Sequence, residues 1–152
     1  MDIFVLSKKD SAKFDYQDKH CWISINDPTD NDWWFKRNDH TVDTLQLQFD
    51  DSTNQESWQA VGYKNFYKRD AVLFDEAMAQ QIFDFVEKNK NKVEAFIVNC
   101  HAGVSRSSGI GSFLNSYFNH NSKFQTPPHH PNSRVRKYLR HIWYKNTGLR
   151  VY

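Results

Sequence analysis

The chain has 152 residues and a formal net charge of +2; 39% of its residues are hydrophobic and 25% are charged. These values are typical of a soluble globular protein, and they predict one domain spanning residues 1–152. The small net charge argues against a nucleic-acid partner, which would favour a more basic chain. No apolar run is long enough to span a membrane. The two cysteines, Cys21 and Cys100, are too few for a disulfide framework.

The first half of the chain predicts three strands, at residues 3–6, 21–25 and 44–49. Polar or mixed segments separate them and predict loops, with a turn at Asn26-Asp27-Pro28 and room for a short helix within residues 29–42. The connection at residues 52–69 is long, and such connections are often functional. Cys21 falls on the second strand, where we expect a small buried hydrophobe.

The second half predicts, in order, a helix at 70–88, a strand at 94–99, a helix at 107–119, an irregular loop at 120–131 and a final helix capped by Asn132 or Ser133 and stopped at Gly148. In the first of these helices, apolar residues recur on one stripe. Strands thus alternate with helices. We therefore expect an α/β fold with a central, mostly parallel sheet flanked by helices.

The stretch Val98-Asn99-Cys100-His101-Ala102-Gly103-Val104-Ser105-Arg106-Ser107-Ser108-Gly109 leads from a predicted strand into a predicted helix. The backbone N–H groups of such a loop, together with the helix dipole, attract an anion of the size of phosphate. Arg106 can bind two oxygens of that anion, and Cys100 would lie below its phosphorus atom. The same field favours the thiolate, which makes Cys100 a candidate nucleophile.

The arrangement Cys-x5-Arg-Ser resembles the phosphate loop of the cysteine-based protein tyrosine phosphatase superfamily. Its particular form, Cys-x-Ala-Gly-x-Ser-Arg-Ser, is most similar to the small predicted tyrosine phosphatases of bacteria and their viruses, relatives of the dual-specificity group. The resemblance covers roughly residues 44–143 and implies the tyrosine phosphatase fold. One position departs from the pattern, because the family usually has histidine where this chain has Asn99, which can hydrogen-bond but carries no charge.

Phosphate would be held by the loop amides and by the arginine side chain, which gives the set His101, Ala102, Gly103, Val104, Ser105 and Arg106. Ser107 can donate a hydrogen bond to the Cys100 sulfur and help it leave in a second step. The expected catalytic residues are Cys100, Arg106, Asp51 and Ser107.

The proton donor to the leaving oxygen is expected to be an aspartate, and three compete. Asp51 ends the strand at 44–49, at the same sheet edge as Cys100, and Phe49-Asp50-Asp51 resembles the strand-end aspartate of some dual-specificity relatives. Asp50 is its neighbour and would point the other way. Asp70 lies thirty residues before Cys100, a separation familiar in the family, but it also suits a helix N-cap. Asp51 is preferred, and the choice stays open.

No metal or cofactor is expected. His129 and His130 are adjacent and have no cysteine or carboxylate near them in the sequence, so they suit a structural brace before the last helix better than a metal site.

The predicted function is hydrolysis of phosphate monoesters through a phosphocysteine intermediate. The expected substrate is above all phosphotyrosine in proteins or peptides, with phosphoserine and phosphothreonine added if the enzyme has dual specificity. One alternative is a pseudophosphatase that binds phosphorylated partners without cleaving them. Another is a phosphatase for RNA 5′ ends or phosphoinositides. A nucleophilic cysteine must stay reduced, and residues 1–10 show no signal peptide, so a cytoplasmic location is expected.

Overall fold

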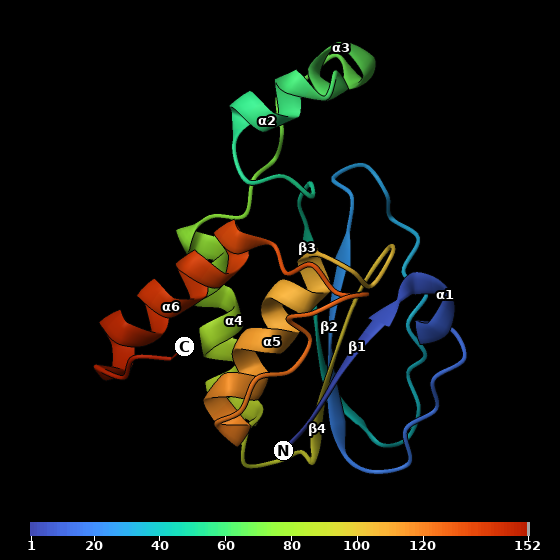
Figure 1. Ribbon diagram of the computed structural model, residues 1–152. Helices are drawn as coiled ribbons and strands as arrows, with labels where there is room; N and C mark the ends of the chain where they lie inside the picture. The colour runs from blue at the N-terminus through green and yellow to red at the C-terminus, as the bar shows by residue number, and fades with distance from the viewer. Residues whose placement is uncertain (152) are drawn as a thin grey trace.

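The computed structural model describes residues 1–151 and contains four strands and six helices within that range. The strands are β1 (Asp2–Ser7), β2 (His20–Asn26), β3 (Thr41–Gln48) and β4 (Ala95–Cys100). The helices are α1 (Lys8–Ser11), α2 (Gln55–Ala60), α3 (Tyr63–Tyr67), α4 (Glu76–Asn89), α5 (Arg106–Asn119) and α6 (Ser133–Thr147). Figure 1 shows the three longest helices, α4, α5 and α6, on one side of the sheet.

The four strands form one sheet in the order β1-β4-β2-β3, and every neighbouring pair is parallel. The predicted α/β class and the helix-flanked sheet are therefore confirmed, with an all-parallel sheet in place of a mostly parallel one. The central strands β2 and β4 are buried along their whole length, as expected for parallel strands covered on both faces. The edge strand β1 buries only Ile3, and its other residues are half-buried or exposed.

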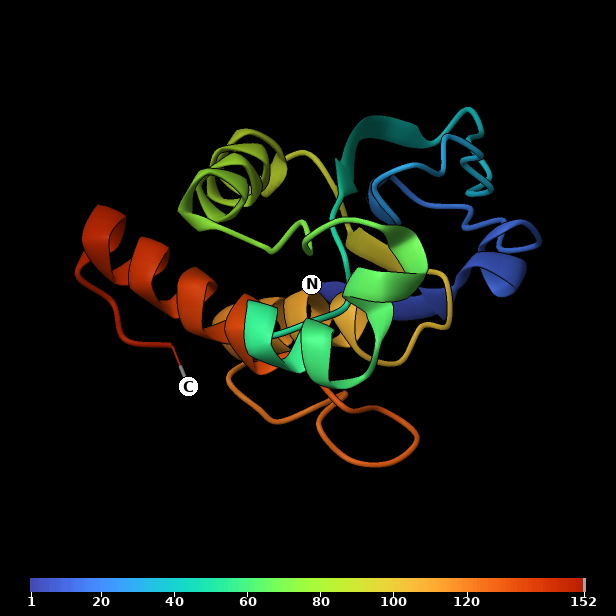
Figure 2. The same ribbon diagram turned by 90° about the horizontal axis from the view of Figure 1, so that it is seen from above.

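The main core lies between the sheet and the helices α4, α5 and α6, and aromatic rings fill much of it. Phe96 of β4 stacks on Phe118 with 5.7 Å between ring centroids, and Phe113 meets Trp143 at 4.8 Å. The opposite face of the sheet is covered by α1 and by irregular segments, whose rings pack on Trp22 of β2 (Figures 1 and 2). Both faces of the central strands are thus buried.

The helix predicted to begin at Asp70 begins at Glu76 instead. Residues 71–75 are not helical, and Asp75 caps α4 by accepting a hydrogen bond from the Met78 amide at 2.9 Å. Phe74 fits the helical stripe of the sequence, but its burial comes from packing on Phe49 at 5.1 Å before the helix starts. Asp70 is therefore not the N-cap.

Two segments predicted without regular structure contain short helices. α1 follows β1 directly, with Ser7 as its cap, and α2 and α3 lie in the long connection between β3 and α4. Figure 1 shows α2 and α3 set apart from the body of the molecule, beyond the end of the sheet at which the strands stop. Among residues 1–151, no helix combines the length and the apolar character needed to cross a membrane.

Candidate active site

The candidate site lies at the edge of the sheet where all four parallel strands end. Ser7, the last residue of β1, is in register with Cys100, the last residue of β4, and Asn26 of β2 is in register with Gln48 of β3. Because the strands are parallel, the segments that follow them meet at this edge. Topology thus brings residues near 7, 27, 50 and 101 together.

Cys100 and Ser107 contact each other across the loop that links β4 to α5. The Cys100 Sγ lies 3.0 Å from the Ser107 Oγ, and both residues are almost completely buried. This pair was expected from the motif. A hydroxyl at this distance can donate a hydrogen bond to a thiolate and stabilise it.

The loop at residues 101–105 is tied to the protein through its carbonyl oxygens. The His101 oxygen accepts a hydrogen bond from the Lys8 amide at 3.1 Å. The Val104 and Ser105 oxygens accept from the amides of His130 and Asn132 at 2.9 and 3.0 Å. The bracing expected from the histidine pair is thus supplied by the backbone of His130, and the loop is held from both sides.

Gly103 fits the loop closely against the end of β1. Its φ is +71°, and a Cβ atom at this position would lie 2.6 Å from the Ser7 nitrogen and 2.7 Å from the Leu6 carbonyl carbon. Only glycine combines this backbone conformation with so close an approach. The motif's glycine therefore sets the path of the 101–105 loop.

The amides of this segment remain unpaired. Among residues 1–151, no acceptor binds a backbone N–H of residues 101–106. The start of α5 also lacks a side-chain cap, because Ser105 at the N-cap position turns its hydroxyl to Asp51. By contrast, α4 and α6 are capped by Asp75 and Asn132. A run of free N–H groups at the N-terminus of a 14-residue helix is a site for an anion.

The Arg106 side chain is buried beside these N–H groups, and only part of its guanidinium is hydrogen-bonded within the protein. Its Nη1 donates to the Asp27 carboxylate at 2.7 Å and to the Phe49 carbonyl at 2.8 Å. No hydrogen bond within residues 1–151 uses Nε or Nη2, and neither atom is buried without a partner. Two nitrogens of a fixed guanidinium, Nε and Nη2, thus remain accessible to a ligand's oxygens.

The three predicted carboxylates have different surroundings. The Asp51 Oδ1 accepts hydrogen bonds from the Ser105 hydroxyl at 2.7 Å and from the Asn132 amide at 3.1 Å, so this carboxylate touches the 101–105 loop. Asp50 is buried and uses both oxygens on Arg69, with a further bond from the Val72 amide. Asp70 is exposed and pairs with Lys64 at 3.2 Å. Of the three, only Asp51 contacts the loop.

Asp27 is a further carboxylate at this edge, and the sequence interpretation missed it. It sits in the turn after β2 and contacts Arg106, a residue 79 positions away, with about half of its own side chain exposed. The signal was present in the sequence, because a turn that follows a buried strand ends at the same edge as Cys100. At the nearby Asp30, the Lys8 ammonium at 2.8 Å holds the pKa of the carboxyl below its usual range.

Asn99 precedes Cys100 on β4, and Cys21 lies on the neighbouring strand β2. Asn99 is buried, and its Oδ1 has no donor among residues 1–151. Cys21 is completely buried, as expected, and burial raises the pKa of its thiol to about 12. No group of three histidine, cysteine or acidic side chains within the described range is placed to hold a metal ion.

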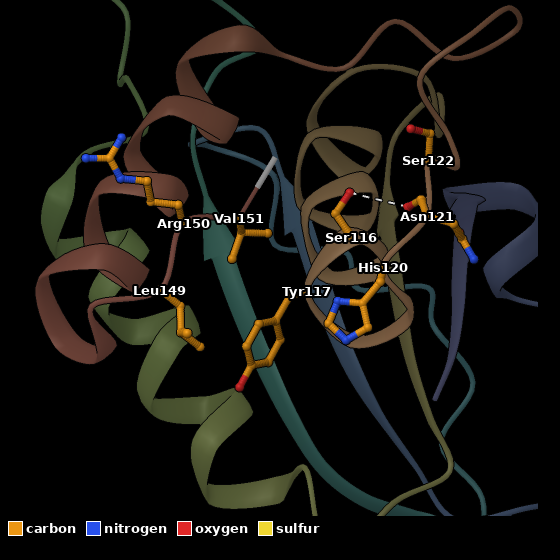
Figure 3. Close-up of a pocket in the computed structure, with 8 residues that line it drawn as sticks. All are labelled: Ser116, Tyr117, His120, Asn121, Ser122, Leu149, Arg150 and Val151. Carbon is orange, nitrogen blue, oxygen red and sulfur yellow. Dashed lines mark hydrogen bonds between the residues drawn. The ribbon is translucent and has the colours of Figure 1, made fainter.

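A cavity of about 420 Å³ lies at the other end of α5, away from Cys100 (Figure 3). It is lined by Ser116, Tyr117, His120, Asn121, Ser122, Leu149, Arg150 and Val151. None of these residues belongs to the predicted site.

No protein-family model matches the chain, and no curated protein does so either.

Proposed function

We propose that the protein is a cysteine-dependent phosphatase that hydrolyses phosphate monoesters, with phosphotyrosine in proteins or peptides as its principal substrate. One observation carries the proposal: unpaired amides run from His101 to Arg106 directly after a cysteine that contacts Ser107. Gly103 and Arg106 in this run are buried, and unpaired N–H groups are costly where they are buried away from water. An oxyanion bound there would satisfy them.

The tyrosine phosphatase fold belongs to the same proposal. The resemblance of the loop motif implies that fold, and a parallel sheet with the nucleophile at the end of the central strand β4 is compatible with it. The proposed chemistry requires a reduced thiol, so we also propose a cytoplasmic setting.

In the first step, the Cys100 thiolate attacks phosphorus. An S–P bond forms, the P–O bond to the leaving group breaks, and protonated Asp51 gives its proton to the departing oxygen. The loop amides and the free N–H groups of Arg106 bind the non-bridging oxygens, where charge must be stabilised in the transition state. The step leaves a phosphocysteine and a neutral alcohol or phenol.

In the second step, water attacks the phosphocysteine. The Asp51 carboxylate takes a proton from that water, the new P–O bond forms, and the S–P bond breaks. Ser107, with its Oγ 3.0 Å from the sulfur, donates a hydrogen bond to the departing thiolate. Inorganic phosphate leaves, and the thiolate and protonated Asp51 are restored without any redox change.

Asp51 is the preferred proton donor because it contacts the 101–105 loop while its Oδ2 makes no hydrogen bond within residues 1–151. Asp27 is ion-paired with Arg106 at 2.7 Å, an arrangement that suits a role in orienting the guanidinium. Asp50 is committed to Arg69 and serves structure.

The test is hydrolysis of p-nitrophenyl phosphate in the presence of a chelator by the wild type, Cys100→Ser and Cys21→Ser. We expect turnover in the wild type and in Cys21→Ser and none in Cys100→Ser. Retained turnover in Cys100→Ser would remove the proposed nucleophile. An inactive wild type that still binds a phosphopeptide would instead favour the pseudophosphatase, which the uncharged Asn99 makes a specific rival.

A further inference from the structure

Residues 53–71, here called the arm, leave the sheet edge directly after Asp51 and contain α2 and α3. Their base is firmly anchored. Arg69 binds both oxygens of Asp50 at 2.7 and 3.1 Å, and its guanidinium lies over the ring of Trp58 at 5.2 Å. The Gln55 side chain exchanges two hydrogen bonds with the backbone of Ala71. These contacts hold the arm in a fixed position relative to Asp51, the proposed proton donor.

The arm exposes large apolar side chains, which lie among exposed lysine and asparagine residues. Trp58 is buried and stacks on Tyr67, but Val61 is 64% exposed and Phe66 is 77% exposed. Figure 1 shows this part of the chain projecting beyond the sheet. A projecting apolar surface carried on an ordered base is typical of a contact surface for another molecule.

A groove of about 360 Å³ runs from the arm to the candidate site. It is lined by Asp51, Ser52, Thr53, Ser57, Val61, Tyr63, Ser105, Pro131, Asn132 and Ser133. Two of these residues, Asp51 and Ser105, are the proposed acid and a member of the phosphate-binding loop. The groove is thus continuous with the proposed active site, and its volume lies in the range of ligand-binding clefts.

We propose that this groove binds the polypeptide on one side of the phosphorylated residue, with an apolar side chain of that polypeptide against Val61 and Tyr63. The inference rests on the proposed phosphatase function and names its substrate as a phosphorylated protein segment with an apolar flank. Hydroxyl and amide groups along the groove can bond to peptide backbone, while the arm supplies the apolar contact.

The charge of the groove separates this substrate from a nucleic acid. Among the described residues that line it, none is lysine or arginine, and Asp51 is acidic. A polyphosphate chain requires positive charge along its path, because phosphate contacts supply most of its affinity. An apolar peptide flank requires none.

The test compares four substrates: p-nitrophenyl phosphate, a 5′-phosphorylated RNA, a phosphotyrosine peptide with leucine and isoleucine beside the phosphotyrosine, and the same peptide with glycine and serine there. The variant is Val61→Asp, and the matched control is Leu149→Asp, since Leu149 is similarly exposed at 54% but lies far from the groove. We expect Val61→Asp to raise KM for the apolar-flanked peptide about tenfold, the effect of losing one strong interface contact. Turnover of p-nitrophenyl phosphate should not change.

An unchanged KM for the apolar-flanked peptide in Val61→Asp, with p-nitrophenyl phosphate still hydrolysed, would overturn the groove assignment and leave the phosphatase standing. A preference for 5′-phosphorylated RNA over both peptides would also overturn it. If the wild type hydrolyses none of these substrates, the proposed function fails. The affinities of the wild type and Val61→Asp for the apolar-flanked peptide then test whether the groove binds it. A Kd weakened about tenfold in Val61→Asp would then support it, and equal Kd values would contradict it.

Discussion

Cys100 and Cys21 lie on neighbouring strands of one sheet, and their surroundings separate their chemistry. Cys21 is sealed in the core, where burial raises the pKa of its thiol to about 12. Cys100 ends its strand beside unpaired amides and Ser107. A thiolate is the reactive form of cysteine, so the two should differ in reactivity toward an anionic alkylating reagent.

We predict that iodoacetate at pH 7 modifies Cys100 and not Cys21. Because burial raises the pKa of the Cys21 thiol to about 12, raising the pH from 6 to 9 should leave it a thiol and unmodified. Inorganic phosphate should slow modification of Cys100 by occupying the same anion site. Peptide mass spectrometry measures both sites in one sample, and modification of Cys21 first, or no protection by phosphate, would count against this account.

The two edge carboxylates should respond differently to the same substitution. Asp51→Asn should lower kcat about 100-fold for phenyl phosphate and much less for p-nitrophenyl phosphate, because a better leaving group needs less protonation. Asp27→Asn should change both substrates equally, since it alters only the support of Arg106. Steady-state kinetics on the two substrates gives the answer. A leaving-group-dependent loss in Asp27→Asn alone would move the acid to Asp27.

The loop between β4 and α5 requires glycine at position 103, and Gly148, which follows α6, serves as a comparison. Gly103 and Gly148 have nearly the same positive φ, +71° and +74°, but only Gly103 is crowded. Gly148→Ala should cost about 1 kcal/mol of unfolding free energy from backbone strain alone. Gly103→Ala should cost about 1–3 kcal/mol more, because its Cβ meets the backbone of Leu6 and Ser7.

Denaturant unfolding of both glycine variants measures this difference. Gly103→Ala should also lose most of its turnover, because relief of the contact displaces the amides that bind phosphate. Equal stabilities for the two variants would mean that the 101–105 loop is not held against β1.

Across the whole molecule, the features that could be predicted from the sequence are the strands and strand ends that depend on local residue patterns. Buried strands were visible as apolar runs, and the position of Cys100 at a strand end followed from the run before it. The contact between Asp51 and the 101–105 loop was also foreseeable, because parallel strands end at one edge.

The rest depends on tertiary contacts that one sequence does not display. The sequence pattern placed the start of α4 too early because Phe74 continues the apolar stripe of the helix. In the structure Phe74 lies in a non-helical segment and packs on Phe49. α2 and α3 are too short to be stable alone, and the anchor of Arg69 on Asp50 holds their base. The Asp27–Arg106 pair joins residues 79 positions apart.

The most direct test of the central claim is to look for a phosphoryl group on Cys100 during turnover. The enzyme would be mixed with p-nitrophenyl phosphate, denatured within milliseconds and digested, and the peptide containing Cys100 would be weighed by mass spectrometry. We predict a phosphorylated Cys100 that appears as fast as the first equivalent of p-nitrophenol, and no such adduct in Cys100→Ser. Steady turnover without any phosphoryl group on Cys100, or an adduct on another residue, would contradict the account.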